Sequence, residues 1–380
     1  MKLDAAITGI GLVTPAGCDG NALWQAVDEE RDCSSPITSG DGAFALKRAG
    51  IINDFKLSNF VGKSPYFRLM SREAMLACAA ARLAIASAGL EGENMQETAI
   101  YAGTGATGLD FKHIERMLEA SRGGNGKFDL QCFSEKGLNQ INPLLSFKIL
   151  PNMPVCFVAI LNNIMGENLI LNPWEGNTSQ AILEAAWSVS GSRDRIVLCG
   201  GSDTKVHSQA FLFLEQLGLL IPDAEPGQTS FIPGEASSYL VFEAKERAGK
   251  RTRARLTAAM TTSDFSCGWT YSNSEKIYCE LLFSLLEEAG IKSEEINALL
   301  LSSNGDNRLG YFERDAINRV FPQKPPAYAI SETITETFAA ASPMKIAAAV
   351  SRIESAAWKK VLVTSFGNGP MKAAFILEAA

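Results

Sequence analysis

The chain alternates between short apolar runs and longer segments in which apolar residues recur at helical spacing. Short apolar runs that end in glycine, proline or polar turns are typical of buried strands. We expect strands within residues 4–17, 97–108, 168–174, 194–203, 236–244, 254–262 and 296–306, and a final strand pair within 359–379. We expect helices at 71–90, 179–190, 274–291 and 342–355.

Strands that alternate with helices predict an α/β layered fold. A chain of 380 residues is too long for one simple core. The order of elements in the second part repeats that of the first. We therefore expect two duplicated halves, residues 1–245 and 246–380.

Composition narrows the class of protein. Hydrophobic residues make up 46% and charged residues 20% of the chain, which is typical of a globular protein. No apolar run reaches the roughly 18 residues that span a membrane. The first 20 residues lack the basic-then-apolar order of a signal peptide, because Asp4 interrupts them. We expect a cytoplasmic protein.

The charge pattern gives no sign of nucleic-acid binding. The net charge is −7, and no basic block stands out except residues 245–255, KERAGKRTRAR. This run is either a solvated connection between the halves or a landing site for an acidic partner.

The chain offers few metal ligands. Its only histidines are His113 and His207, and none of its eight cysteines forms a CxxC pair. We therefore expect no metal site, no disulfide framework and no cofactor, with most cysteines acting as small buried apolar groups.

A glycine-rich segment matches the dinucleotide fingerprint only superficially. GTGATG, residues 103–108, has the GxGxxG spacing. The fingerprint belongs at the first strand–helix turn, however, and this segment lies about 100 residues into the chain. The first strand carries GIGLVT, which lacks the third glycine. The sequence does not favour a nucleotide site.

The stretch LNPWEGNTSQAILEAAW, residues 171–187, predicts a strand that turns sharply into a helix. Many enzymes keep their nucleophile at such a turn, but this chain has Glu175 at its tip. Glu175 is either an acid that stabilises the helix start through the dipole and free amides, or a group with a chemical role. Both can hold together.

Several blocks, in order over nearly the whole chain, resemble the β-ketoacyl synthases of fatty-acid and type II polyketide assembly. They are ITGIGLVTPAG, FRLMSREAMLACAAARLAIASAGL, AIYAGTGATGLDF, LPNMPVCFVAILNNIMGENLIL, IPGEASSYLVFE and SFGNGPMKAAFIL. The resemblance implies a thiolase-like five-layered αβαβα fold with two duplicated halves. It also implies an obligate dimer, with the strand within 168–171 crossing the interface.

The same resemblance locates the family's catalytic groups. A decarboxylating Claisen condensation needs a thiolate to hold the acyl chain and donors at the malonyl thioester. In the family these are a cysteine and two histidines, and their positions here hold Glu175, Asn304 and Thr337. The family's lysine falls on Glu332, and its gating phenylalanine falls on Asn368. All four catalytic groups are absent, and neither histidine of this chain matches a catalytic position.

One branch of the family fits these losses. Chain-length factors are inactive synthase-like subunits that pair with an active ketosynthase, and they commonly carry glutamine at the cysteine position. GLDFKHIERML, residues 108–118, resembles their tunnel-floor segment at the heterodimer interface. The tunnel or interface candidates are Phe111, Lys112, Ile114, Glu115 and Arg116. The ordinary alternative is that Phe111, Ile114, Met117 and Leu118 form the buried stripe of a helix.

The leading hypothesis is a non-catalytic chain-length factor that pairs with an active ketosynthase and limits product chain length. Acyl carrier protein would then dock mainly on the partner. A second hypothesis is an enzyme of altered chemistry, in which Glu175 assists malonyl-thioester decarboxylation. A third is a homodimeric acyl-binding scaffold. The fold alone does not choose between these functions.

Overall fold

The computed structural model describes residues 3–37, 46–105, 111–193, 195–220, 231–266 and 271–380, without the side chains of residues 111–113. The strands are β1 (Ala5–Val13), β2 (Ser35–Pro36), β3 (Arg48–Ala49), β4 (Ala99–Thr104), β5 (Asn168–Leu171), β6 (Ile196–Thr204), β7 (Glu235–Glu243), β8 (Ala254–Ser263), β9 (Ala298–Leu300), β10 (Ala327–Tyr328), β11 (Lys360–Ser365) and β12 (Met371–Ala379). The helices are α1 (Gly20–Asp28), α2 (Ser58–Val61), α3 (Arg72–Ser87), α4 (Phe111–Ala120), α5 (Leu130–Cys132), α6 (Ser146–Ile149), α7 (Met153–Asn162), α8 (Glu175–Ser190), α9 (Ser208–Gln216), α10 (Lys245–Ala248), α11 (Ser274–Ala289), α12 (Asn307–Val320), α13 (Ile330–Ile334) and α14 (Ala341–Glu354).

Ten of the described strands are hydrogen-bonded in the order β10-β9-β11-β12-β8-β1-β7-β6-β4-β5. The two halves meet where residues 5–7 of β1 pair antiparallel with residues 254–256 of β8. Strands β4, β5 and β6 are parallel, as are β9, β10 and β11. The predicted division after residue 245 falls between β7 and β8 and stays a prediction.

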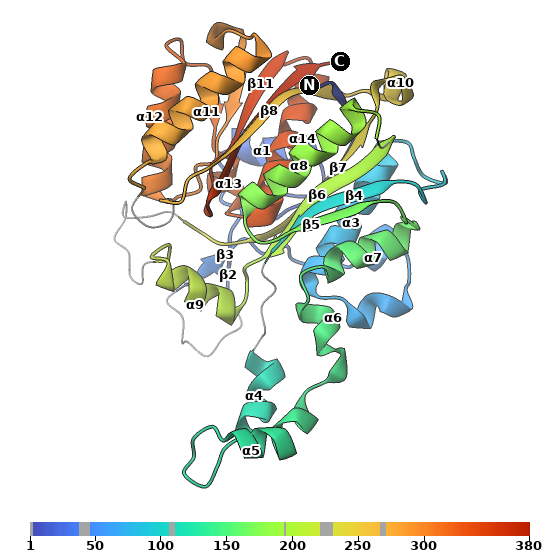
Figure 1. Ribbon diagram of the computed structural model, residues 1–380, viewed down its shortest axis with the longest axis vertical. Coiled ribbons are helices and arrows are strands. Elements are labelled where there is room, and N and C mark those ends of the chain that lie inside the picture. Colours follow the sequence, from blue (N-terminus) through green and yellow to red (C-terminus); the bar gives the residue numbers. More distant parts are fainter. Residues whose placement is uncertain (1–2, 38–45, 106–110, 194, 221–230, 267–270) are drawn as a thin grey trace.

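Three hydrophobic clusters separate five layers. Helices α8 and α14 share the middle cluster with residues from both halves of the sheet (Figure 1). Helices α3 and α7 cover the outer face of the first half, and α11 and α12 cover the outer face of the second. The five-layered α/β arrangement expected from the sequence is confirmed.

Both faces of the central strands are buried, which explains their nearly continuous apolar runs. In β11, Val361 and Val363 join the middle cluster, whereas Leu362 joins the outer cluster with α11 and α12. Successive side chains of a strand point to opposite faces, so each half of the sheet contributes side chains to two hydrophobic clusters.

Two predicted elements differ from the structure. The expected strand within 296–306 ends at Leu300, and the residues that follow form a polar loop beside the candidate site. The helix expected from residue 179 begins four residues earlier, at Glu175. Helix α12 was not predicted, although Asp306 caps it and accepts a hydrogen bond from the amide of Arg308.

The basic run 245–255 forms salt bridges with other parts of the chain. Its side chains pair as Lys245 and Arg255 with Asp4, Arg247 and Arg251 with Glu243, and Arg253 with Glu354. These pairs engage five of the six basic residues of the run with carboxylates of this chain, which favours the structural interpretation over a landing site for an acidic partner.

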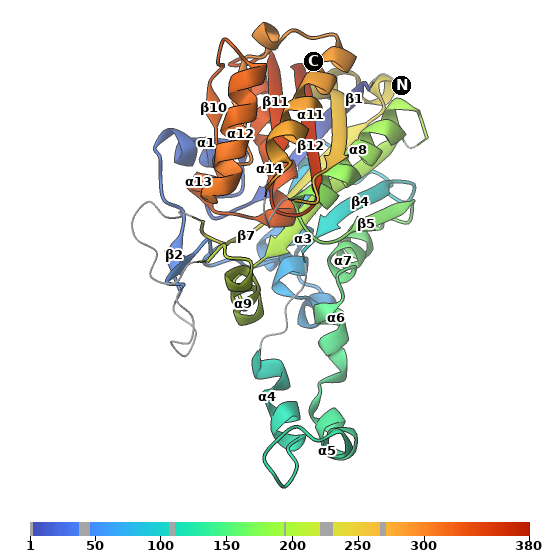
Figure 2. The ribbon, with the colours of Figure 1, turned by 60° about the vertical axis from the view of Figure 1, so that its left-hand side comes forward.

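Residues 111–150 form an arm that extends away from the layered body (Figures 1 and 2). It consists of α4, α5, α6 and short turns of other helix types. In the described part of the chain, no single helix is long and apolar enough to cross a membrane. The bent pair Pro143–Ile149 and Met153–Asn162 has the necessary length and composition only when taken together.

The packing of α3 on β1 generates a first prediction. A Cβ at Gly11 would lie 2.0 Å from the backbone oxygen of Ala80 in α3. Gly11→Ala should therefore lower the free energy of unfolding by about 2–3 kcal/mol, because backbone must move to make room. Gly124→Ala is the control, since a Cβ there meets nothing within 4 Å. Urea denaturation of both variants gives the comparison. Equal stabilities would contradict the close contact.

Candidate functional site at the start of helix α8

A three-residue turn leads from β5 into α8. The Asn172–Pro173 peptide is cis, and Trp174 has a φ of 77°. The Asn172 amide donates to the backbone oxygens of Thr104 (2.8 Å) and Gly105 (2.6 Å), which ties the turn to the end of β4. The sequence predicted Glu175 at the tip of the turn. In the structure it is the first residue of the helix. Its position fits the favourable end of the helix dipole.

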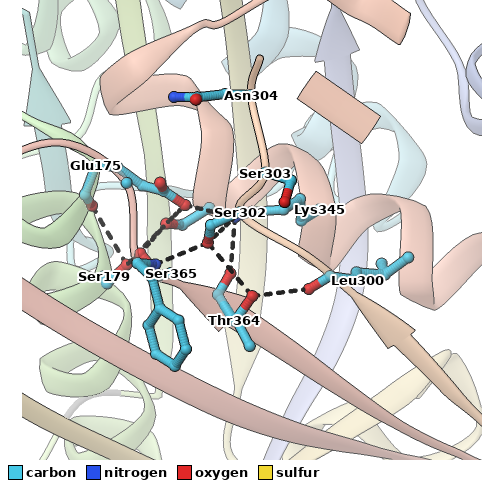
Figure 3. Close-up of polar contacts among 12 residues, drawn as sticks. Glu175, Ser179, Leu300, Ser302, Ser303, Asn304, Lys345, Thr364 and Ser365 are labelled. Atoms are coloured by element: carbon cyan, nitrogen blue, oxygen red, sulfur yellow. Dashed lines mark hydrogen bonds and ion pairs between the residues drawn. The ribbon is translucent and has the colours of Figure 1, made fainter. Parts of the chain in front are cut away.

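The Glu175 carboxylate is buried and paired with a lysine (Figure 3). Its Oε1 lies 2.6 Å from Nζ of Lys345, and the hydroxyl of Ser342 donates to the same oxygen at 3.0 Å. The hydroxyls of Ser179, Ser342 and Ser365 lie 2.6–2.9 Å from one another. A buried carboxylate is costly unless it is paired and hydrogen-bonded, and this one is both.

Lys345 connects this carboxylate to the second half of the protein. Its ammonium donates to Oγ of Ser302 at 3.0 Å and to the backbone oxygen of Thr364 at 2.7 Å. Beyond them, the Glu313 carboxylate accepts from the amides of Ser302 (2.8 Å) and Ser303 (2.7 Å). Burial raises the pKa of Glu313. The network thus joins α8, α14, β11, α12 and the loop after β9.

A second buried carboxyl, Glu336, lies close to the first. Its oxygens accept from the amide of Asn304 and the backbone N–H of Phe338, each at 2.5 Å. Burial, together with the charge of Glu175, raises the pKa of Glu336 to about 7. Asn304 also lies 3.4 Å from Oδ1 of Asn368.

The structure brings four of the five predicted site positions together. Glu175, Asn304, Thr337 and Asn368 are all buried around the start of α8. Glu332, by contrast, is exposed on α13. Their correspondence to the family's catalytic positions stays a prediction.

Sequence reasoning missed the two groups that complete the cluster, Lys345 and Glu336. Lys345 could have been noticed as a lone charge in the apolar segment SPMKIAAAV. Glu336 directly precedes Thr337 and offered no comparable signal.

The glycines of GTGATG have a packing role where they are described. A Cβ at Gly103 would lie 1.7 Å from Oγ1 of Thr178 in α8, and one at Gly105 would lie 2.0 Å from Oδ1 of Asp203. Close approach of α8 and β6 therefore accounts for both glycines without a nucleotide. Residues 106–108 lie outside the described part.

The tunnel or interface candidates lie on α4, in the arm, away from the start of α8 (Figure 2). The side chains of Phe111 and Lys112 lie outside the described residues. Glu115 and Arg116 are exposed, and Ile114 is half-buried. Of the stripe that the ordinary alternative expects, Leu118 is exposed and Ile114 and Met117 are half-buried, so that alternative stays open.

The cluster holds a charge that is compensated within the protein. The carboxylate of Glu175 is neutralised by an ammonium and is almost completely shielded from solvent. Burial raises the pKa of the thiols of Cys78 and Cys199, which disfavours the thiolate form that a nucleophile needs. In the described ranges, no three His, Cys, Asp or Glu side chains come together as metal ligands.

The ion pair leads to a second prediction. Lys345→Met should lower the free energy of unfolding by about 3–5 kcal/mol, because the Glu175 charge stays buried without its partner. Glu175→Gln combined with Lys345→Met should recover most of this loss. Urea denaturation of the two single variants and the double variant measures the coupling. Additive effects would show that the two groups do not interact.

Glu336 leads to a third prediction. The native state holds a proton on this carboxyl up to about pH 7, whereas the unfolded chain releases it near 4.5. Stability from this group therefore falls as pH rises through that window, by up to about 3 kcal/mol. Glu336→Gln should lose this part of the pH dependence, whatever constant offset the substitution adds. Urea denaturation at pH 5 and pH 8 tests it. An unchanged difference between the two pH values would contradict the assignment.

Comparison with known proteins finds several that are similar to this chain. The chain is similar to "Putative polyketide beta-ketoacyl synthase 2" of Streptomyces coelicolor, with 23% identity over 79% of this chain and 70% of the relative. Among solved structures, it resembles "The ishigamide ketosynthase/chain length factor", with a TM-score of 0.79, 20% identity and full coverage of both chains. It also resembles a type II PKS acyl-carrier protein complex with its ketosynthase, with a TM-score of 0.79, 17% identity and full coverage of both.

The structural likenesses, at such low identity, concern the fold. The sequence gives the family directly, since the model of the β-ketoacyl synthase N-terminal domain matches residues 4–248, well over half of the chain. The protein described here is a member of the β-ketoacyl synthase family.

Proposed function

We propose that this chain is a non-catalytic chain-length factor of a type II polyketide or polyene ketosynthase. In this role it pairs with an active ketosynthase, shapes the shared tunnel and limits product length. The observation that carries the proposal is the buried pair of Glu175 and Lys345 at the position expected for the nucleophile. The fold around it is that of the family, so on this proposal the chain has kept the scaffold and lost the chemistry.

The similar proteins support this branch of the family. One relative is named "Putative polyketide beta-ketoacyl synthase 2", and one structural neighbour is described as a ketosynthase/chain length factor. Another is described as an acyl-carrier protein in complex with its ketosynthase. By extension, the acyl carrier protein would dock mainly on the partner of this chain. The cytoplasmic location expected from the sequence remains a prediction.

The surface of the chain supports a partner subunit. The arm exposes large apolar side chains with little of the chain's own body to cover them: Leu118, Phe128, Leu130, Leu138, Leu144, Phe147 and Leu150. Apolar surface of this kind is typical of a protein–protein interface. On this proposal the exposed face of α4, including Ile114, Glu115 and Arg116, contributes to the partner's tunnel.

The edge of the sheet supports the same conclusion. Strand β5 pairs with β4 and lies at the end of the described strand order. Its outer edge would leave backbone donors and acceptors available for another chain. The exposed side chains of Ile160 and Met165 lie shortly before it in the sequence. A partner strand would extend the sheet at this edge.

The two alternatives receive less support. An enzyme that uses Glu175 as a base would need this carboxylate accessible and uncompensated, whereas it is buried against Lys345. A homodimeric acyl-binding scaffold would use the same edge and arm for a second copy. The mass of the assembly separates this alternative from the heterodimer.

A co-expression experiment tests the proposal. Co-expressed with an active type II ketosynthase from its own source, the chain should form a one-to-one complex by native mass spectrometry. After incubation with acyl-loaded carrier protein, only the ketosynthase should gain acyl mass. Leu130→Asp with Leu138→Asp should weaken the complex by about tenfold or more, because charges would be placed in an apolar interface.

The matched control is Tyr311→Asp on α12, an exposed aromatic position far from the arm. It should leave the complex intact. A stable homodimer with condensing activity, or acyl mass on this chain alone, would overturn the proposal.

A further inference from the structure

Four aromatic side chains cluster beside the paired carboxylate. The ring of Trp174 lies 5.7 Å from that of Phe213 and 5.9 Å from that of Phe338, and Phe231 lies 6.1 Å from Phe338. They come from four separate segments: the turn before α8, helix α9, the segment before β7 and the 3-10 turn Phe338–Ala340. We call this set the aromatic plug.

The plug extends from an exposed side chain to residues next to the degenerate site. Trp174 directly precedes Glu175, and Phe338 directly follows Thr337. Phe338 and Phe231 are buried and Trp174 is half-buried, whereas Phe213 is 41% exposed on α9. Contacts between aromatic rings therefore continue from solvent inward to the neighbour of Glu175.

The inner ring of the plug is fixed by polar groups. The backbone N–H of Phe338 donates to Oε1 of Glu336, and the ammonium of Lys205 lies 5.0 Å from the centre of the Phe338 ring. Lys205 is itself paired with the buried carboxylate of Asp203. A cation over a ring in a site shielded from water adds to the packing of the aromatic group. Phe338 is thus held by contacts on its backbone and on its face.

The ring of Trp174 is held just as closely. A Cβ at Gly369 would lie 2.8 Å from the Trp174 ring, and a Cβ at Gly367 would lie 2.1 Å from Oε2 of Glu175. The two glycines let the closing loop pack directly against the indole and the carboxylate. At these two contacts the packing leaves no room for even one more carbon atom.

We propose that the aromatic plug blocks the access of an acyl donor to position 175 of this chain. The chain would then lack condensing activity for two reasons, the missing nucleophile and the blocked access. The inference rests on the proposed non-catalytic function and adds to it. It means that a cysteine restored at this position would stay shielded from an acyl donor. Acyl chains would reach only the partner's nucleophile.

Thiol labelling tests the plug without any ketosynthase assay. Glu175→Cys introduces a thiol, and its modification by N-ethylmaleimide is followed site by site with mass spectrometry. Lys345 beside it favours the thiolate, so slow labelling would report poor access and not poor reactivity. The exposed Cys18 and the buried Cys199 of the same chain serve as internal references.

We expect the introduced thiol to react about a hundredfold more slowly in the native protein than in urea, because access requires local opening. Trp174→Gly should raise the native rate by about tenfold or more. Glycine suits this position, since the φ of 77° is unfavourable for a side chain. Trp187→Ala, which removes a part-exposed indole near the other end of α8, should leave the rate unchanged.

Either of two results would overturn the inference: native labelling of the introduced thiol as fast as that of Cys18, or no acceleration by Trp174→Gly. If the lone Lys345 destabilises the first variant, Glu175→Cys with Lys345→Met avoids the unpaired charge. Access is then read from the acceleration that Trp174→Gly causes in that same background, because both proteins lack the ammonium. Slow labelling of Cys199 verifies that each variant is folded. The proposed function is judged separately, by complex formation of the unmodified chain.

Discussion

The buried ion pair between Glu175 and Lys345 joins the two helices of the middle layer, α8 from the first half and α14 from the second. A carboxylate this far from water requires a compensating charge and further hydrogen bonds. Lys345 supplies the charge, and Ser342 supplies a hydrogen bond. Lys345 in turn needs acceptors, which the loop after β9 and strand β11 provide. The need to compensate this one buried charge therefore accounts for the polar groups that surround it between α8 and α14.

This arrangement changes what the turn between strand and helix can do. In an active family member, the resemblance implies a thiolate at the start of this helix. In this chain the helix starts with a carboxylate that is paired with an ammonium, and the pKa of the neighbouring Glu336 is raised to about 7. The aromatic side chains of Trp174 and Phe338 pack against the site from the side of α9. This interior fits the proposed non-catalytic subunit, which would act through its surface.

The contribution of such a subunit would lie on its surface. The arm exposes large apolar side chains, and β5 is the last strand in the described order of the sheet. Both features lie within residues 4–248, the segment matched by the family model. On the proposed function, the exposed apolar surface would be covered by another subunit.

The sequence by itself determined the layered α/β class, because buried strands and alanine-rich helices leave distinct apolar patterns, as in residues 71–90 and 359–379. It also located Glu175, Asn304, Thr337 and Asn368, through their place in short blocks that resemble the family. The start of α8, the partner of Glu175 and the role of Glu336 were decided only by the tertiary structure. Lys345 is 170 positions away from Glu175 in the chain, and a pairing over that distance leaves no local pattern. It exists because two helices from different halves pack face to face in a layer that excludes water.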